Sequence, residues 1–88
     1  MKFEIYGDKV TISEKMSADI EEKLGELSKY LLIDPNTTAR VLVKDNDAIL
    51  KIEITIPSKV GLLRSEILHS DFYTGLNLAI DKLEDQIR

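Results

Sequence analysis

The chain has 88 residues, a formal net charge of −4 and a pI of about 4.9, with 43% hydrophobic and 32% charged residues. This length allows one domain, and the mixture is that of a folded protein and not of a disordered tail. The sequence contains no cysteine, which excludes disulfides and thiolate chemistry, and no apolar run reaches the roughly 18 residues of a membrane span. We therefore expect a single domain, residues 1–88, in the cytoplasm.

The first half of the sequence predicts a strand followed by a helix. Residues 2–6 alternate between apolar and polar side chains, which is typical of a half-buried strand, and Gly7 is expected to end or bend it. Ser13 is a favourable N-cap residue, because its hydroxyl can accept a hydrogen bond from the first helical turn. Apolar residues at three- and four-residue steps then predict a helix that stops before Pro35: Met16, Ile20, Leu24, Leu27 and Leu31.

The second half predicts three strands and a second helix. Residues 38–44 and 48–56 are rich in β-branched side chains, and the intervening Asp45-Asn46-Asp47 predicts a tight hairpin turn. Residues 62–68 predict a third strand, after a turn around Pro57 to Gly61. Residues 72–88 carry apolar side chains at helical spacing on one face, which leaves Lys82, Gln86 and Arg88 outside.

This order of elements predicts an α+β fold, β-α-β-β-β-α, with one four-stranded sheet. A strand, helix, strand unit lays its helix on one face of the sheet, and the second helix is expected to share that face. The other face would be open to water, as the polar residues that alternate along the strands suggest. These outward candidates are Lys2, Glu4, Lys44, Lys51, Glu53, Arg64 and Glu66.

The sequence offers little for catalysis or for cofactor binding. His69 is the only histidine, and it has no second histidine or cysteine to complete a metal site or a nucleophile pair, so we interpret it as a surface or capping residue. No glycine-rich phosphate loop precedes either helix. We therefore expect that the protein is not an enzyme and that it binds no metal, cofactor or small-molecule substrate.

The remaining candidates are cationic residues on the helices and the last strand. They are interleaved with acidic residues, and such mixed patterns usually only keep a helix soluble. The acidic net charge is also the opposite of the basic surface expected of an RNA-binding protein. Charge alone therefore favours a solubilising role for Lys23, Lys29, Arg64, Lys82 and Arg88.

Three motifs nevertheless resemble the N-terminal domain of the ribosome hibernation promoting factors, also called ribosome-associated inhibitors or sigma-54 modulation proteins. The segment Ser13 to Leu31 is similar to the capped first helix of that family, with Lys23-Leu24-Gly25 and Lys29-Tyr30 at matching places. The run K-I-E-I-T-I-P, from Lys51 to Pro57, is similar to the K-V-E-V-T-I-P of the family. The string D-F-Y at residues 71–73 resembles the start of its second helix, D-M-Y. The resemblance extends along the whole chain.

The resemblance implies the same fold, related to double-stranded-RNA-binding domains, and a non-enzymatic function. A domain of this family would bind the small ribosomal subunit in the decoding channel and occlude messenger and transfer RNA. Cations on the helices would contact phosphates of 16S rRNA. The positions carried over by the resemblance are Lys23, Lys29, Lys82 and Arg88, with Arg64 and Gln86 as further candidates.

The sequence also departs from this family. Glu22 and Glu26 stand where relatives commonly have lysine, and Glu84-Asp85 occupies a stretch that is usually more basic. Relatives continue beyond this point with a basic tail and, in long forms, with a C-terminal domain to which dimerisation is attributed. Two interpretations stay open, an excised N-terminal domain and a complete chain with weaker, salt-sensitive RNA affinity. A different class of function, an acidic protein-interaction module without direct RNA binding, is the alternative.

Overall fold

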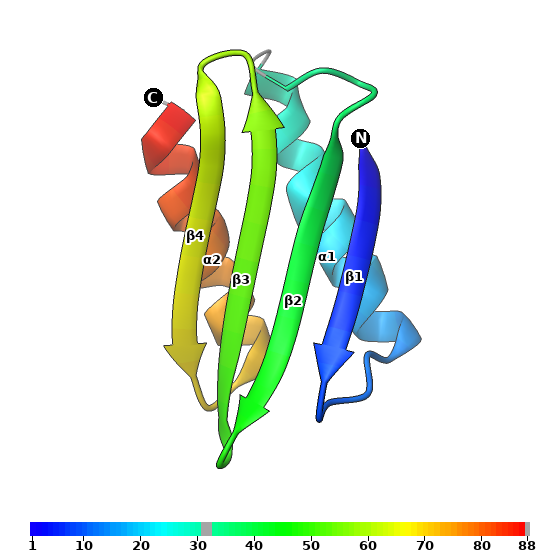
Figure 1. Cartoon of the computed structure of the whole chain (residues 1–88), viewed down its shortest axis with the longest axis vertical. Helices are drawn as coiled ribbons and strands as arrows, with labels where there is room; N and C mark the ends of the chain where they lie inside the picture. Colours follow the sequence, from blue (N-terminus) through cyan, green and yellow to red (C-terminus); the bar gives the residue numbers. More distant parts are fainter. Residues whose placement is uncertain (31–32, 88) are drawn as a thin grey trace.

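The computed structural model describes residues 1–30 and 33–87, and its element order is the β-α-β-β-β-α predicted from the sequence (Figure 1). In one sheet of order β1-β2-β3-β4, β1 is parallel to β2, and the β2–β3 and β3–β4 pairs are antiparallel. Both helices cover the same face of this sheet, as expected (Figure 1). The elements are β1 (Lys2–Asp8), α1 (Glu14–Leu27), the 3₁₀ turn η1 (Ser28–Tyr30), β2 (Thr38–Asn46), β3 (Ile49–Ser58), β4 (Gly61–His69) and α2 (Phe72–Ile87).

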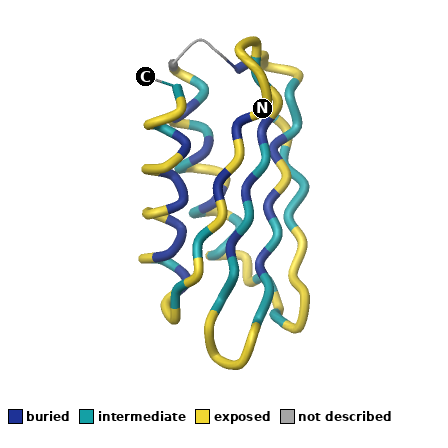
Figure 2. The backbone as a smooth tube through the Cα atoms, turned by 60° about the vertical axis from the view of Figure 1, so that its left-hand side comes forward, coloured by how far each residue is buried: buried dark blue, intermediate teal, exposed yellow. Residues whose placement is uncertain are grey.

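The hydrophobic core lies between the two helices and the covered face of the sheet (Figure 2). Side chains alternate along each strand, so one in two points into this layer. Each fully buried leucine or isoleucine contributes about 1.5–3 kcal/mol relative to an exposed one. The largest buried side chains come from both helices and the two central strands: Ile20, Leu24, Leu27, Val41, Val43, Ile52, Ile54, Ile56, Leu76 and Leu83.

The first helix is shorter than the apolar spacing predicts. Ser13 caps it as expected, because its Oγ accepts a hydrogen bond from the Met16 N–H at 3.1 Å. The α-helix ends at Leu27, and residues 28–30 continue as a 3₁₀ turn. The Ser28 hydroxyl donates to the Gly25 carbonyl at 2.6 Å, and this local bond favours the tighter turn. Leu31, the last residue of the expected stripe, lies outside the described residues.

The β2–β3 hairpin turns one residue later than predicted. β2 extends to Asn46, which pairs with Ile49, so the two turn residues are Asp47 and Ala48. Both have positive φ, 56° and 67°, as a two-residue turn that matches the twist of the strands requires. The Asp45 carboxylate accepts a hydrogen bond from the Ala48 N–H at 3.1 Å and so stabilises the turn.

Glycine is required near the end of β1, where the strand is two residues longer than predicted. A Cβ atom at Gly7 would collide with the backbone carbonyl oxygen of Val10, because the chain turns at Lys9 and brings Val10 back beside Gly7. Residues 10–12 are not part of the sheet. The glycine therefore lets the chain leave β1 and enter α1 within a few residues.

Candidate functional site

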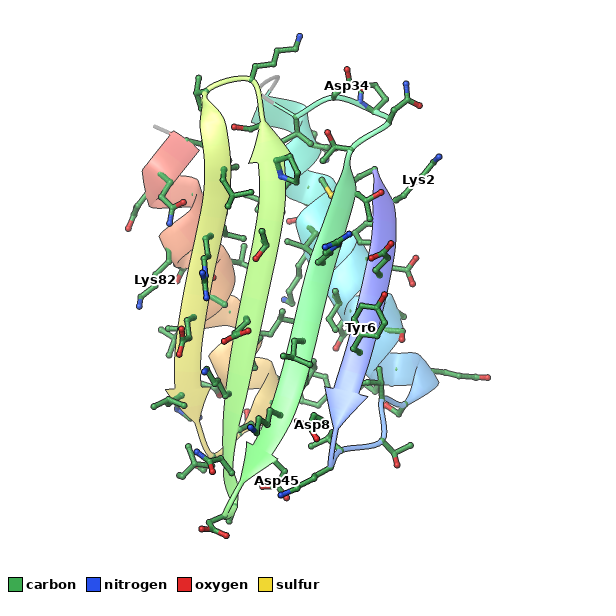
Figure 3. The ribbon with its side chains drawn as sticks, viewed as in Figure 1. Lys2, Tyr6, Asp8, Asp34, Asp45 and Lys82 are labelled. Carbon is green, nitrogen blue, oxygen red and sulfur yellow. The ribbon has the colours of Figure 1, made fainter. Side chains whose placement is uncertain are left out.

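The predicted cationic residues that the structure describes lie on four different elements. Lys23 is half-buried on α1, and Lys29 is exposed in η1. Arg64 is exposed on β4, and its side chain points to the open face of the sheet. Lys82 is exposed on α2, on the outer side of the molecule (Figure 3). Arg88 lies outside the described residues.

Three of the predicted residues meet where α2 runs beside β4, and we call Arg64, Lys82 and Gln86 the β4-edge cluster. The Gln86 side chain accepts a hydrogen bond from the Arg64 backbone N–H at 3.0 Å and donates one to the Arg64 carbonyl at 2.6 Å. The Lys82 ammonium donates to the Glu66 carbonyl at 3.3 Å. These contacts satisfy main-chain groups on the outer edge of β4, which has no neighbouring strand.

The position of α2 explains why these side chains reach the strand. Lys82 and Gln86 are four residues apart and therefore lie above one another on one side of the helix. Behind them, the buried Ser65 hydroxyl donates to the Ala79 carbonyl at 3.0 Å and ties β4 to α2. Gly75 allows the close approach, because a Cβ atom there would lie 2.9 Å from the Ile52 Cδ1 atom. The helix is thus held against the sheet along most of its length.

In the half of the open sheet face that lies away from the N-terminus, charged side chains pair with one another. Lys51 forms ion pairs with Glu53 at 3.0 Å and Glu66 at 3.2 Å, and Lys44 lies 3.9 Å from Asp8. The hydrogen bond to Glu53, and then the one to Glu66, raise the pKa of Lys51 above its ordinary value. This part of the face therefore offers little free positive charge to an anionic partner.

The described residues support the expectation that His69 has a local role. Its Nδ1 atom accepts a hydrogen bond from the Asp71 backbone N–H at 2.9 Å, at the turn from β4 to α2. Within residues 1–30 and 33–87 there is no group of three or more histidine, cysteine, aspartate or glutamate side chains that could hold a metal ion. The same residues form no helix long and apolar enough to cross a membrane.

Sequence reasoning missed the cations at the N-terminal end of the open face as a group. Lys2 was expected to face outward, but Arg40 was not singled out, although the strand pairing brings it beside Glu4. The pairing also aligns Arg40 and Arg64 on either side of Thr55. The alternation within each strand assigns these residues to one face, but only the register between strands places them next to each other.

Comparisons with known proteins show what the chain is similar to. The family model described as "Sigma 54 modulation protein / S30EA ribosomal protein" matches residues 3–88. The protein named "Ribosome hibernation promotion factor" from Staphylococcus aureus (strain COL) is 44% identical over 89 residues, which cover 100% of this chain and 47% of that protein. The chain therefore spans about half the length of this curated relative.

Solved structures share the fold. The N-terminal domain of Protein Y from Thermus thermophilus matches with a TM-score of 0.87 and 27% identity, over 99% of this chain and 96% of that chain. A ribosomal subunit interface protein from Coxiella burnetii matches with a TM-score of 0.82 over 99% of this chain and 93% of that one. Its identity is 20%, so this second likeness supports the fold alone.

Proposed function

Because the chain belongs to the Sigma 54 modulation protein / S30EA ribosomal protein family, we propose that it is a non-enzymatic hibernation factor that binds the small ribosomal subunit. In this proposal the domain lies in the decoding channel, contacts 16S rRNA and excludes messenger and transfer RNA. The alignment of the whole chain with a relative named for ribosome hibernation carries the proposal. The chain spans 47% of that relative, so the proposal assigns occlusion, and not the pairing of ribosomes, to residues 1–88.

The chemistry of the candidate site fits a binding function. Lysine and arginine side chains hold RNA phosphates by charge and hydrogen bonds, without a covalent step. Lys82 uses one contact to the Glu66 carbonyl, and an ammonium group has three N–H donors, so donors remain for a phosphate. Lys23 and Lys29 would add charge from α1 and η1. Gln86 is engaged with the backbone of Arg64, and we propose that it supports the site by holding α2 in place.

Sedimentation with purified small ribosomal subunits tests this function. We expect the wild-type chain to co-sediment at about 50 mM salt, to be released at about 200 mM salt, and to compete with initiator transfer RNA. Reversing the charge of two helix lysines, in a Lys23→Glu, Lys82→Glu variant, should abolish co-sedimentation. The matched control reverses Lys9, in the connection after β1, and Lys44, on β2, which are not among the proposed contacts, and it should still bind. Equal binding by both variants would overturn the proposed surface.

The alternative, an acidic protein-interaction module, makes a different prediction in the same experiment. Its support is the net charge of −4, which disfavours phosphate contacts at long range. Binding to subunits that persists unchanged between about 50 and about 200 mM salt would favour contacts with a ribosomal protein over phosphate recognition. Release by salt would favour the RNA contacts.

A further inference from the structure

The open face of the sheet divides into two halves of different charge. Two rows of neighbouring side chains lie at the end near the N-terminus: the strand register gives Glu4–Arg40–Thr55–Arg64 and the pairs Lys2–Thr38 and Pro57–Leu62, and Thr38 and Pro57 line the same hollow, which completes the row Lys2–Thr38–Pro57–Leu62. These rows hold three cations and one carboxylate, which gives a net charge of +2. The two rows beyond them, Tyr6–Leu42–Glu53–Glu66 and Asp8–Lys44–Lys51–Leu68, hold two cations and three carboxylates. A chain of net charge −4 thus concentrates positive charge at one end of one face.

Figure 3 shows this face toward the reader. Lys2 projects from the start of β1, whereas Asp8 and Asp45 lie at the opposite end. Asp34 lies near the Lys2 end, beside the turn that carries Lys59, and both line an adjoining hollow. Their opposite charges offset each other, so the positive charge of the two rows is retained.

A hollow lies within the cationic rows. It is lined by Thr38, Arg40, Thr55, Pro57 and Leu62 and has a volume of about 320 Å³. Leu62 is 62% exposed, so one wall offers an uncovered apolar side chain. Arginine, a threonine hydroxyl and apolar carbon atoms therefore meet in one place. Such a combination suits a ligand that is anionic at one end and flat or apolar at the other.

The two arginines can act on one anion. Arg40 and Arg64 are separated by one strand, so their Cα atoms are about 10 Å apart, and their long side chains can converge above Thr55. The Nε atom of Arg40 lies 3.1 Å from a Glu4 carboxylate oxygen, which orients the guanidinium and leaves its terminal amino groups for a ligand. Among the described residues, the Arg64 guanidinium and the Lys2 ammonium have no ion-pair partner.

We propose that this hollow is a binding site for single-stranded RNA, in which Arg40 and Arg64 hold one phosphate and Pro57 and Leu62 contact the adjacent ribose or base. Lys2 adds charge along the path of the strand. The site lies on the sheet face away from the helices that carry Lys23 and Lys82 (Figure 1). The domain therefore has a second RNA-binding surface, which shares only Arg64 with the residues expected to contact the small subunit.

Fluorescence anisotropy with a labelled short oligouridine tests this site. In single variants, Arg40→Gln and Arg64→Gln should each weaken binding about five- to tenfold at about 50 mM salt. Each should also lower the slope of log K against log salt, by at most about 0.7, which is the value for one neutralised phosphate of a single strand. Lys44→Gln is the matched control, because it removes one charge from the other end of the same face, and it should stay within about twofold of wild type.

Three results would overturn this inference. They are no oligouridine binding by the wild-type chain at about 50 mM salt, equal binding by the arginine variants and by Lys44→Gln, and release of the RNA by inorganic phosphate beyond its effect on ionic strength. The last result would indicate a site for a free anion. Because the arginines are exposed, circular dichroism should show the variants folded. Weakened oligouridine binding by Arg40→Gln with normal subunit sedimentation supports the inference alone, because Arg40 is not among the residues expected to contact the small subunit, whereas the Lys23→Glu, Lys82→Glu variant tests the proposed function.

Discussion

Ala48 holds a backbone conformation that suits glycine better than alanine. Its φ of 67° places the backbone in the left-handed region, where the Cβ atom crowds the following carbonyl oxygen at a cost of about 1–2 kcal/mol. We expect Ala48→Gly to stabilise the domain by about 0.5–1 kcal/mol, because relief of this strain exceeds the added entropy of the unfolded chain. The midpoint of thermal unfolding should rise by about 2–8 °C. Ala18→Gly, in α1, should lower it, and a lower midpoint for Ala48→Gly would contradict the turn geometry.

Asp71 links the stability of the domain to pH. Its carboxylate caps α2 by accepting a hydrogen bond from the Thr74 N–H at 2.8 Å. This bond, and then the other contacts with Thr74 and the nearby His69, lower the pKa of Asp71 below its ordinary value of 3.8. A carboxylate with a lowered folded pKa stabilises the fold above its unfolded pKa, and this contribution is lost as the pH falls through the folded pKa.

The Asp71→Ala variant should therefore unfold at a lower temperature than wild type at neutral pH. The difference between the two midpoints should shrink as the pH falls below about 4, where the wild-type carboxylate becomes protonated. Thermal unfolding followed by circular dichroism at several pH values measures this. Asp71→Asn separates the hydrogen bond from the charge, because asparagine can still cap the helix but does not titrate. A difference in unfolding midpoint between wild type and Asp71→Ala that stays constant with pH would show that the charge of Asp71 contributes nothing.

At the scale of elements, the contact between α2 and the edge of β4 is held by few groups. Gln86→Ala removes both hydrogen bonds to the Arg64 backbone and should cost about 0.5–1.5 kcal/mol, since exposed bonds contribute at the low end of the range for each. Amide hydrogen exchange at Arg64 should become faster, because its N–H then faces water. Asp85→Ala changes the exposed neighbour and serves as the control. Unchanged exchange at Arg64 would contradict the edge contact.

The sequence predicts the elements well where the apolar period is long, and less well at their ends. The helix stripe from Met16 to Leu27 was confirmed, but the end of α1 depends on one hydroxyl of Ser28 that competes for a main-chain carbonyl. The apolar residues of the two strands could have placed the hairpin turn better. Val41 pairs with Ile54, and Val43 with Ile52, and the midpoint of both pairs falls between Asp47 and Ala48. The local composition of three polar residues suggested an earlier turn.

At the scale of the whole molecule, the fold was predictable and the charge distribution was not. The order of strands and helices, together with the alternation of side chains, is sufficient for one sheet with one covered face. The position of the cationic end depends on how four strands are aligned, and three of its cations come from strands far apart in the sequence: Lys2, Arg40 and Arg64. The β4-edge cluster likewise joins residues that are 22 positions apart. Such contacts depend on strand register and on packing, which cannot be read directly from a single sequence.

The closure of the β4 edge by α2 also limits how copies of this domain could assemble through their sheets. The Lys2 N–H bonds to the Thr37 carbonyl at 2.8 Å, so the alternate residues Phe3, Ile5 and Gly7 direct their main-chain groups away from β2. The β1 edge is therefore open to pairing with a strand of another molecule, whereas side chains of α2 occupy the main-chain groups of Arg64 and Glu66 on the β4 edge. A polymer of native sheets needs two open edges in every subunit, so the occupied β4 edge opposes growth of this kind beyond a pair.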